Sequence, residues 1–314
     1  MIYFDHAASS FPKPKTVALA MAEAIEQYGA NPGRGGHQLA RRAKDVIDNT
    51  RKKLADMFQA PSGKHVFFYQ NATMAMNQAL LGFPFQKDDH VVTTMFEHNS
   101  MIRPLEKLVK EKGISVTYVQ PNEEGIITID ALKNACTSRT KMVAVTHASN
   151  VTGALIRLEQ LASLKEEKDV VLFVDASQTA GTIPIHMEDD NIDLLAFPGH
   201  KSLLGPQGIG VLICRDDFQL EPLLYGGTGS YSELLEQPPS WPERYEAGTL
   251  NTPGIAGLSA GLDEVNRLSI EKIYAHEQTL LQLCLEEMDT IDGLTAVGPK
   301  RLEDRVAVVS FSLQ

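Results

Sequence analysis

A lysine between two apolar segments is the residue of this sequence best suited to covalent chemistry. Residues 192–197 and 209–214 are typical of buried strands, and the turn between them carries Gly199, His200 and Lys201. Lysine is rarely buried without a partner, and burial at the rim of an apolar pocket favours its neutral form. A neutral amine can form a Schiff base with a carbonyl group. An ordinary solvated loop lysine is the alternative.

Polar side chains also follow four other apolar segments, at the point where each segment ends. Each group has an ordinary explanation, such as a helix cap for Asn71, Thr73 or Asp175, or a core-edge position for a histidine. Together they offer a helix N-terminus for a phosphate, a flat ring for stacking and an acid for a protonated ring nitrogen. With the amine of Lys201, this is the set that pyridoxal phosphate requires. The four groups are QNAT at 70–73, MFEHN at 95–99, HASN at 147–150 and DASQ at 175–178.

Strands and helices alternate along the part of the chain that carries these groups. The alternation predicts an α/β fold, with a mainly parallel sheet covered by helices on both faces. Ligands bind such sheets outside the carboxyl ends of the strands. Besides the two segments beside Lys201, we predict strands at 2–4, 65–69, 90–94, 115–119, 142–146, 170–174, 294–297 and 306–313. We predict helices at 15–28, 39–58, 73–81, 101–112, 129–135, 158–167, 253–268 and 270–291.

The segment between the first two helices is rich in Gly and Pro and carries Arg34 and His37. Functional groups concentrate on such loops, so both residues are candidates for substrate binding. A plain interhelix loop explains the segment equally well.

The composition excludes several classes of protein. The chain has 314 residues, of which 43% are hydrophobic, so it can build a large domain and a smaller one and is not disordered. The net charge of −11 argues against nucleic acid or an anionic membrane surface as a partner. No apolar segment reaches the ~18 residues of a membrane helix and no signal peptide is evident, so we expect a cytoplasmic protein.

The three cysteines, Cys136, Cys214 and Cys284, lie far apart in the sequence. Their spacing matches neither a disulfide framework nor a metal site, so we expect no metal. We expect all three to be buried free thiols.

The sequence resembles the class V aminotransferase family of pyridoxal-phosphate enzymes, and within it the cysteine desulfurase and selenocysteine lyase branch. The matching motifs occur in family order over almost the whole chain. The resemblance implies a type I pyridoxal-phosphate-dependent transferase fold. Its large cofactor-binding domain would span residues 15–250, and residues 1–14 with 251–314 would form a smaller α+β domain whose C-terminal part we expect to be missing. The motifs are YFDHAAS near the start, NATMAMN at 71–77, FEHNS at 96–100, HASNVTG at 147–153, VDASQ at 174–178, GHKSLLGPQGIG at 199–210 and YEAGTLNTPGI at 245–255.

The resemblance also implies roles for individual residues. Three would be catalytic: Lys201 as the Schiff-base lysine, His98 stacked on the cofactor ring, and Asp175 paired with the pyridinium nitrogen. Asn150 would lie near the ring hydroxyl and the substrate carboxylate. The other cofactor contacts would be Ala72, Thr73, Gln178 and His200, with Thr249 supplied by the partner subunit of a homodimer.

The sequence departs from the family pattern at two motifs. Pro198 stands where a hydroxyl residue is usual, and Met74 stands where a glutamate is common. In the desulfurases, the sulfur-accepting cysteine and the arginine that binds the substrate carboxylate lie on segments beyond residue 314. None of the three cysteines present is predicted on a mobile loop, so we nominate none as the nucleophile.

The implied activity is removal of sulfur or selenium from L-cysteine or L-selenocysteine, which leaves L-alanine. The implied partners are a small amino-acid substrate, a second copy of the chain and a sulfur-acceptor protein. An aminotransferase, or a cysteine C–S lyase that gives pyruvate, is the first alternative, because neither reaction needs a catalytic cysteine. A catalytically silent fragment that binds pyridoxal phosphate is the second.

Overall fold

The computed structural model describes residues 2–33, 36–215, 219–231 and 233–314, which fall into two compact units. Unit 1 comprises Met1–Pro84, His186–Glu188 and Asp193–Arg267. Unit 2 comprises Phe85–Ile185, Asp189–Ile192 and Leu268–Gln314. This grouping does not test the predicted division into a large domain at 15–250 and a small one, which stays a prediction.

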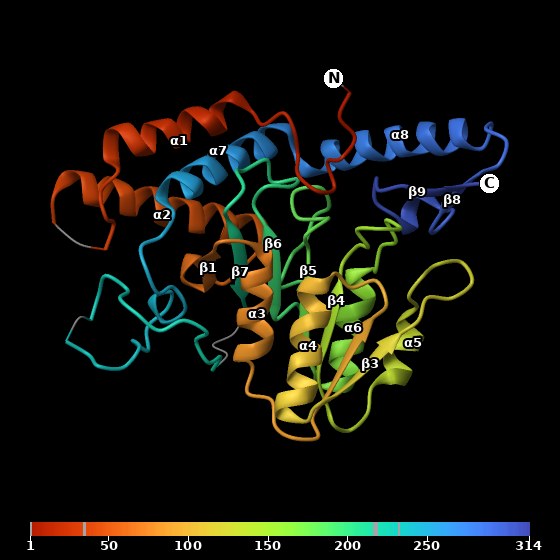
Figure 1. Cartoon of the computed structure of the whole chain (residues 1–314), viewed down its shortest axis with the longest axis horizontal. Helices are drawn as coiled ribbons and strands as arrows, with labels where there is room; N and C mark the ends of the chain where they lie inside the picture. The colour runs from red at the N-terminus through yellow and green to blue at the C-terminus, as the bar shows by residue number, and fades with distance from the viewer. Residues whose placement is uncertain (1, 34–35, 216–218, 232) are drawn as a thin grey trace. The chain divides into compact units, whose positions relative to one another are not determined.

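Unit 1 contains three antiparallel strands in the order β1-β7-β6 (Figure 1). All residues of β6 and β7 are buried, as expected of apolar strands covered on both faces. The turn that carries Lys201 joins these two strands. The strands are β1 (Val66–Tyr69), β6 (Leu194–Pro198) and β7 (Gly210–Cys214), and the helices are α1 (Lys15–Tyr28), α2 (Gln38–Phe58), α3 (Ala72–Gly82) and α7 (Thr252–Leu268).

Unit 2 contains four parallel strands in the order β5-β4-β2-β3. Their pairing aligns the carboxyl ends, so that Thr146 at the end of β4 is the register partner of Asp175 at the end of β5. A separate antiparallel pair, β8 and β9, lies near the C-terminus. The strands are β2 (His90–Thr94), β3 (Ser115–Val119), β4 (Thr140–Thr146), β5 (Val171–Asp175), β8 (Leu294–Val297) and β9 (Ser310–Leu313), and the helices are α4 (Asn99–Lys112), α5 (Ile129–Ala135), α6 (Leu158–Lys168) and α8 (Ile270–Met288).

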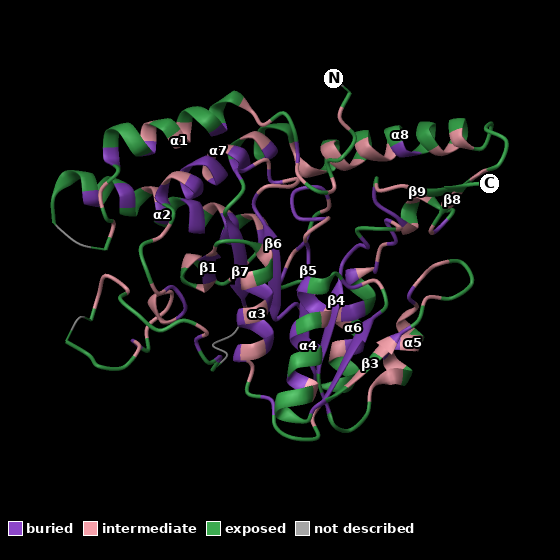
Figure 2. Cartoon of the chain, viewed as in Figure 1, coloured by how far each residue is buried: buried purple, intermediate pink, exposed green. Residues whose placement is uncertain are grey.

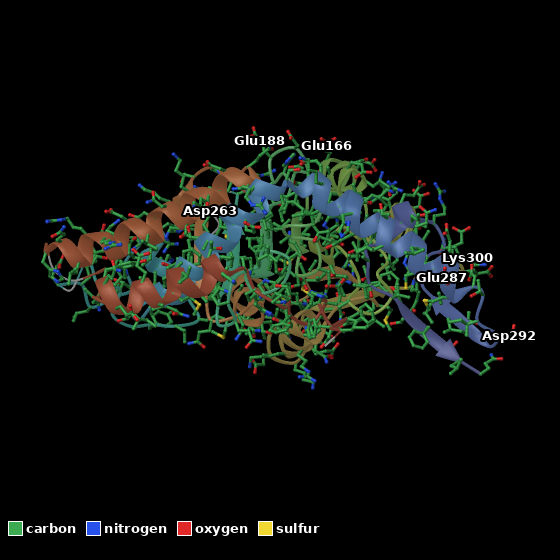
Figure 3. All side chains as sticks on the ribbon, turned by 90° about the horizontal axis from the view of Figure 1, so that it is seen from above. Glu166, Glu188, Asp263, Glu287, Asp292 and Lys300 are labelled. Carbon is green, nitrogen blue, oxygen red and sulfur yellow. The ribbon has the colours of Figure 1, made fainter. Side chains whose placement is uncertain are left out.

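Burial follows the predicted α/β pattern within each unit. Figure 2 shows β4 and β5 as buried strands in unit 2 and β6 and β7 as buried strands in unit 1. Charged side chains such as those of Asp263 on α7 and Glu287 on α8 are exposed (Figure 3), whereas a smaller set that includes Asp175 is buried. None of the described helices combines the length and the apolar character that crossing a membrane requires.

Several predicted strands differ from the structure by one or two residues at an end, and two differ by more. Residues 2–4 form no strand, and Ile2 and Phe4 are 82% and 91% exposed, because their alternating apolar pattern finds no strand edge to pair with. The last predicted strand, 306–313, is shorter, since β9 begins only at Ser310. The amide of Val306 instead donates to the carbonyl of Gly153 at 2.9 Å.

Candidate active-site residues

The turn that carries Lys201 is closed by its own backbone hydrogen bonds in unit 1. The amide of Gly199 donates to Ile209 O, and the amide of Gly205 donates to Gly199 O, both at 2.9 Å. The amide of Leu204 donates to Lys201 O, also at 2.9 Å. Lys201 itself is half-buried. The structure therefore holds the lysine on a short, internally bonded turn at the end of a buried strand.

The N-terminal segment anchors this turn from outside, which the sequence analysis missed. Ser10 Oγ donates to Lys201 O at 2.8 Å, and the amide of Ser10 donates to His200 O at 3.2 Å. Lys13 Nζ donates to Ser10 Oγ at 2.7 Å and also to His200 O. Ser10 and Lys201 are 191 positions apart in the sequence, so no local spacing could have revealed the contact.

The surroundings of the turn's histidine favour its neutral form. Burial lowers the pKa of His200 from its ordinary value, and the charges of Lys201 and Lys13 lower it further. Burial also lowers the pKa of Lys13 to about 8. Two amines and a neutral imidazole thus lie on or against one turn of unit 1, and such a group can receive an anion or an aldehyde.

The first turn of α3 lies directly against the start of β7. A Cβ at Gly210 would come within 2.1 Å of Asn71 C and 2.6 Å of Ala72 N, so only glycine permits this approach. The Asn71 side chain accepts the amide of Met74 at 2.9 Å and caps the helix. Thr73 is exposed in that first turn. The amides and positive dipole end of an 11-residue helix suit a phosphate group here.

The remaining candidates of unit 1 lie apart from the lysine turn in sequence. Thr249 is exposed, accepts a hydrogen bond from Asn31 Nδ2 at 3.2 Å, and lines a cavity of about 860 Å³ within unit 1. His37 caps α2, where its Nδ1 accepts the amide of Ala40 at 3.3 Å. Arg34, the other candidate for substrate binding, lies outside the described residues.

In unit 2, His98 presents an exposed ring at the start of α4. Its Nδ1 accepts the amide of Ser100 at 3.2 Å and lies 2.7 Å from Ser100 Oγ. These two contacts fix the orientation of the imidazole at the helix N-cap, while the residue stays exposed. A ring held in this way is suited to stacking on a flat ligand.

Asp175 is the buried acid of unit 2, with only 2% of its surface exposed. Its Oδ1 accepts the amide of Ser177 at 2.8 Å, which turns the chain toward the half-buried Gln178. Its carbonyl accepts the amide of His147 at 2.9 Å. The strand end thus holds a carboxylate in a sheltered position, as pairing with a protonated ring nitrogen requires.

Asn150 lies exposed on the tight turn after β4. Ser149 closes that turn, because its Oγ accepts the amides of Val151 and Thr152 at 3.2 Å each. Gly153 completes it at a φ of +74°, in the left-handed region that favours glycine. The side chain of Asn150 therefore projects from a well-defined backbone.

His147 is buried and has structural contacts, which supports the ordinary explanation of a histidine at the edge of the core. The ring is 2% exposed, and its Nδ1 lies 2.8 Å from Thr179 Oγ1. Burial lowers its pKa to about 3, so the imidazole is neutral.

The sequence analysis also missed Glu97, which is buried beside the strand ends of unit 2. Its Oε1 accepts hydrogen bonds from Thr94 Oγ1 at 2.7 Å and from the amide of Thr146 at 2.9 Å. Burial, with a smaller contribution from the charge of Asp175, raises the pKa of Glu97 to about 8, although the hydrogen bonds from Thr146 and Thr94 act to lower it. The sequence shows only its position, since Glu97 lies three residues after the end of β2 and directly precedes His98.

The expectation of three buried thiols holds for Cys214, holds in part for Cys136 and fails for Cys284. Cys214 is buried and Cys136 half-buried, and burial raises the pKa of both thiols. Cys284 is exposed on α8, because its helix turns that side chain away from the core. The prediction of a buried thiol is therefore wrong for Cys284.

Each unit suits part of the chemistry of pyridoxal phosphate. Unit 1 offers an amine on an anchored turn and a helix N-terminus that glycine brings against a strand. Unit 2 offers a sheltered carboxylate and an exposed, oriented ring. The residues present therefore fit this cofactor.

Comparison with known proteins decides the family. A family model described as aminotransferase class-V matches residues 2–314. The chain belongs to the class V aminotransferase family. The match confirms the family predicted from the motifs, whose members depend on pyridoxal phosphate. The similarity to the solved structure described below confirms the type I fold.

Relatives of this chain include proteins named as cysteine desulfurases. A probable cysteine desulfurase of Pyrococcus abyssi is 36% identical over 323 residues, which cover 100% of this chain and 79% of the relative. A cysteine desulfurase of Haloferax volcanii is 31% identical, with 75% of its length covered. The apo structure of a cysteine desulfurase from Thermococcus onnurineus matches with a TM-score of 0.94 at 34% identity, covering 99% of this chain and 78% of that one.

Proposed function

We propose that this chain is a pyridoxal-phosphate-dependent cysteine desulfurase that removes sulfur from L-cysteine and leaves L-alanine. The observation that carries the proposal is the similarity to cysteine desulfurases over the full length of the chain. In this reaction the C–S bond of the substrate breaks and an S–S bond forms, because a cysteine thiolate takes the sulfur and becomes a persulfide. The substrate's β-carbon takes up a proton. L-Selenocysteine, with selenium in place of sulfur, would react in the same way.

We assign the residues that would hold the cofactor from the motifs. Lys201 would bind the aldehyde covalently, and the first turn of α3, with Ala72, Thr73 and His200, would bind the phosphate. Asp175 would hold a proton on the ring nitrogen, and Gln178 would contact the ring hydroxyl. His98 would stack on the ring. When bound, pyridoxal phosphate supplies an electron sink for the substrate's α-carbon.

The substrate contacts form a separate part of the proposal. Asn150 would bind the substrate carboxylate from its exposed turn, and Lys201, once released by the substrate amine, would move a proton at the α-carbon. His37 and Arg34 stay candidates for substrate binding. The raised pKa values of Cys136 and Cys214 disfavour both as the sulfur-accepting thiolate.

The expected partners are a second copy of the chain, which would supply Thr249, and a sulfur-acceptor protein. The exposure of Thr249 and its position on the wall of a cavity support a role toward another chain. Sedimentation of the purified protein tests the homodimer. The cytoplasmic location stays a prediction.

Product analysis tests the activity directly. The purified chain would be loaded with pyridoxal phosphate and supplied with L-cysteine, with Lys201→Ala as the control. With an added thiol as the sulfur acceptor, we expect alanine and sulfur bound to that thiol from the wild type. We also expect a covalent cofactor that borohydride fixes to the wild type and not to Lys201→Ala. Pyruvate in place of alanine would assign the chain to C–S lyases. Cofactor capture without turnover of L-cysteine or L-selenocysteine would favour a silent binding protein.

A further inference from the structure

The two peptide groups on either side of the Lys201 Cα are both held by the N-terminal segment of unit 1. The carbonyl of His200, which precedes this Cα, accepts the amide of Ser10 at 3.2 Å and the ammonium of Lys13. The carbonyl of Lys201, which follows it, accepts Ser10 Oγ at 2.8 Å. With both neighbouring peptide planes held, the direction in which the Lys201 side chain leaves the turn is also set.

Lys13 determines which hydrogen bond the Ser10 hydroxyl accepts and which it donates. An ammonium group only donates hydrogen bonds, so Ser10 Oγ must act as the acceptor in its 2.7 Å contact with Lys13 Nζ. The hydroxyl proton is then available for a carbonyl oxygen, and Lys201 O is the nearer of the two within reach. Bonds from a charged donor are stronger than neutral ones, especially where water is partly excluded. Ser10 is 9% exposed and Lys13 is half-buried, so water competes poorly for these bonds.

We propose that Lys13 is a positioning residue for Lys201, acting through Ser10 and the carbonyl of His200 to orient the turn for covalent capture of an aldehyde. The inference rests on the proposed function in taking that aldehyde to be pyridoxal phosphate. Lys13 neither reacts nor contacts the ring in this scheme. The rival explanation is that Lys13 only stabilises unit 1 as a whole.

A comparison of two ligands separates these explanations. Pyridoxal phosphate can bond covalently to Lys201, whereas 4′-deoxypyridoxine 5′-phosphate lacks the aldehyde and reports the remaining contacts alone. For Lys13→Met, we expect the affinity for pyridoxal phosphate to fall at least about tenfold more than the affinity for the deoxy analogue. An equal fall for both ligands would overturn the proposal, because the covalent step would then be untouched.

Two further variants sharpen this comparison. Lys13→Arg keeps a charged donor and is expected to recover most of the difference between the two ligands, whereas failure to recover any of it would count against an orienting hydrogen bond. Lys15→Met removes an exposed lysine two positions away and is expected to match the wild type for both ligands.

Hydrogen exchange of the cofactor-free protein gives a second and independent readout. If Lys13 anchors the turn, Lys13→Met should speed exchange at the bonded amides of Gly199, Leu204 and Gly205 while the amides of α3 stay as in the wild type. Unchanged exchange in the turn, or equal acceleration throughout unit 1, would overturn the proposal. If the wild type captures no pyridoxal phosphate, the proposed function fails, and this readout alone still decides the role of Lys13.

Discussion

The carboxyl group of Glu97 joins two strand ends through the amide of Thr146, which donates to its Oε1 at 2.9 Å. Thr146 is in turn the register partner of Asp175 on the neighbouring strand. The second oxygen of Glu97 is buried without a hydrogen-bond partner among the residues that the structure describes. A carboxyl group at position 97 that keeps its proton adds no second negative charge beside Asp175.

Replacing Glu97 by glutamine should change how stability depends on pH. The folded pKa of about 8 lies above the ordinary 4.5, so between these values the folded protein keeps a proton that the unfolded chain releases. The free energy of unfolding of the wild type therefore falls as pH rises from about 4.5 to 8. Glutamine does not ionise, so Glu97→Gln removes this loss of stability. By pH 8 the unfolding free energy of the variant should exceed that of the wild type by roughly 4 kcal/mol.

Urea unfolding of the cofactor-free protein at several pH values measures this difference. Glu26→Gln is the matched control, because Glu26 is exposed on α1. It should leave the pH profile unchanged. Parallel profiles for the wild type and Glu97→Gln would mean that Glu97 is ionised in the folded protein.

Asp175→Asn should separate cofactor binding from turnover. The asparagine oxygen can still accept the amide of Ser177, so we expect the fold and the covalent capture of pyridoxal phosphate to persist. An amide cannot keep the ring nitrogen protonated, and the loss of one such electrostatic contact typically slows kcat by ~10²-fold or more. Steady-state alanine formation measures the effect, with exposed Asp169→Asn as control. Undiminished kcat would remove Asp175 from the catalytic set.

Gly210→Ala should disturb the helix N-terminus assigned to the phosphate. The new Cβ would overlap Asn71 at 2.1 Å, and because the clash is with backbone, α3 must shift. We expect a loss of roughly 1–3 kcal/mol in unfolding free energy, together with weaker binding of 4′-deoxypyridoxine phosphate. Gly227→Ala is the control, since no atom of the described residues, apart from its chain neighbours, lies within 4 Å of a Cβ there. Full affinity in Gly210→Ala would place the phosphate elsewhere.

Much of the fold could be predicted because its signals are local. Helix Lys15–Tyr28 and the strands His90–Thr94 and Ser115–Val119 have the predicted bounds, since apolar spacing and Gly or Pro mark their ends. The strand predicted at residues 2–4 was wrong because an apolar pattern alone does not supply a partner strand. The strand prediction was also wrong for residues 306–309, because a long-range contact to the turn at Gly153 replaces strand pairing there.

The candidate site also contains residues that local sequence signals predict and residues that they do not. Lys201, Asp175 and His98 stand at predictable strand ends, so their residue types could be singled out. The supporting residues could not, because Ser10 and Lys13 act on a turn 187–191 positions away. The pKa of Glu97 depends on burial, which one apolar segment does not determine.

Arg305 links the chain after residue 298 to the turn that carries Asn150. Its guanidinium is almost fully buried and donates to Pro299 O and Val308 O at 2.9 Å each and to Thr152 O at 3.2 Å. Arg305→Met would leave these three carbonyl groups without their donor, so we expect the unfolding free energy to fall by on the order of 3 kcal/mol.

The same substitution should loosen the turn locally, with faster hydrogen exchange at the amides of Val151, Thr152 and Gly153. Exposed Arg301→Met serves as the control and should change neither quantity. If Arg305→Met lowers stability but leaves exchange at these amides unchanged, then the Ser149 hydrogen bonds alone define the backbone that presents Asn150.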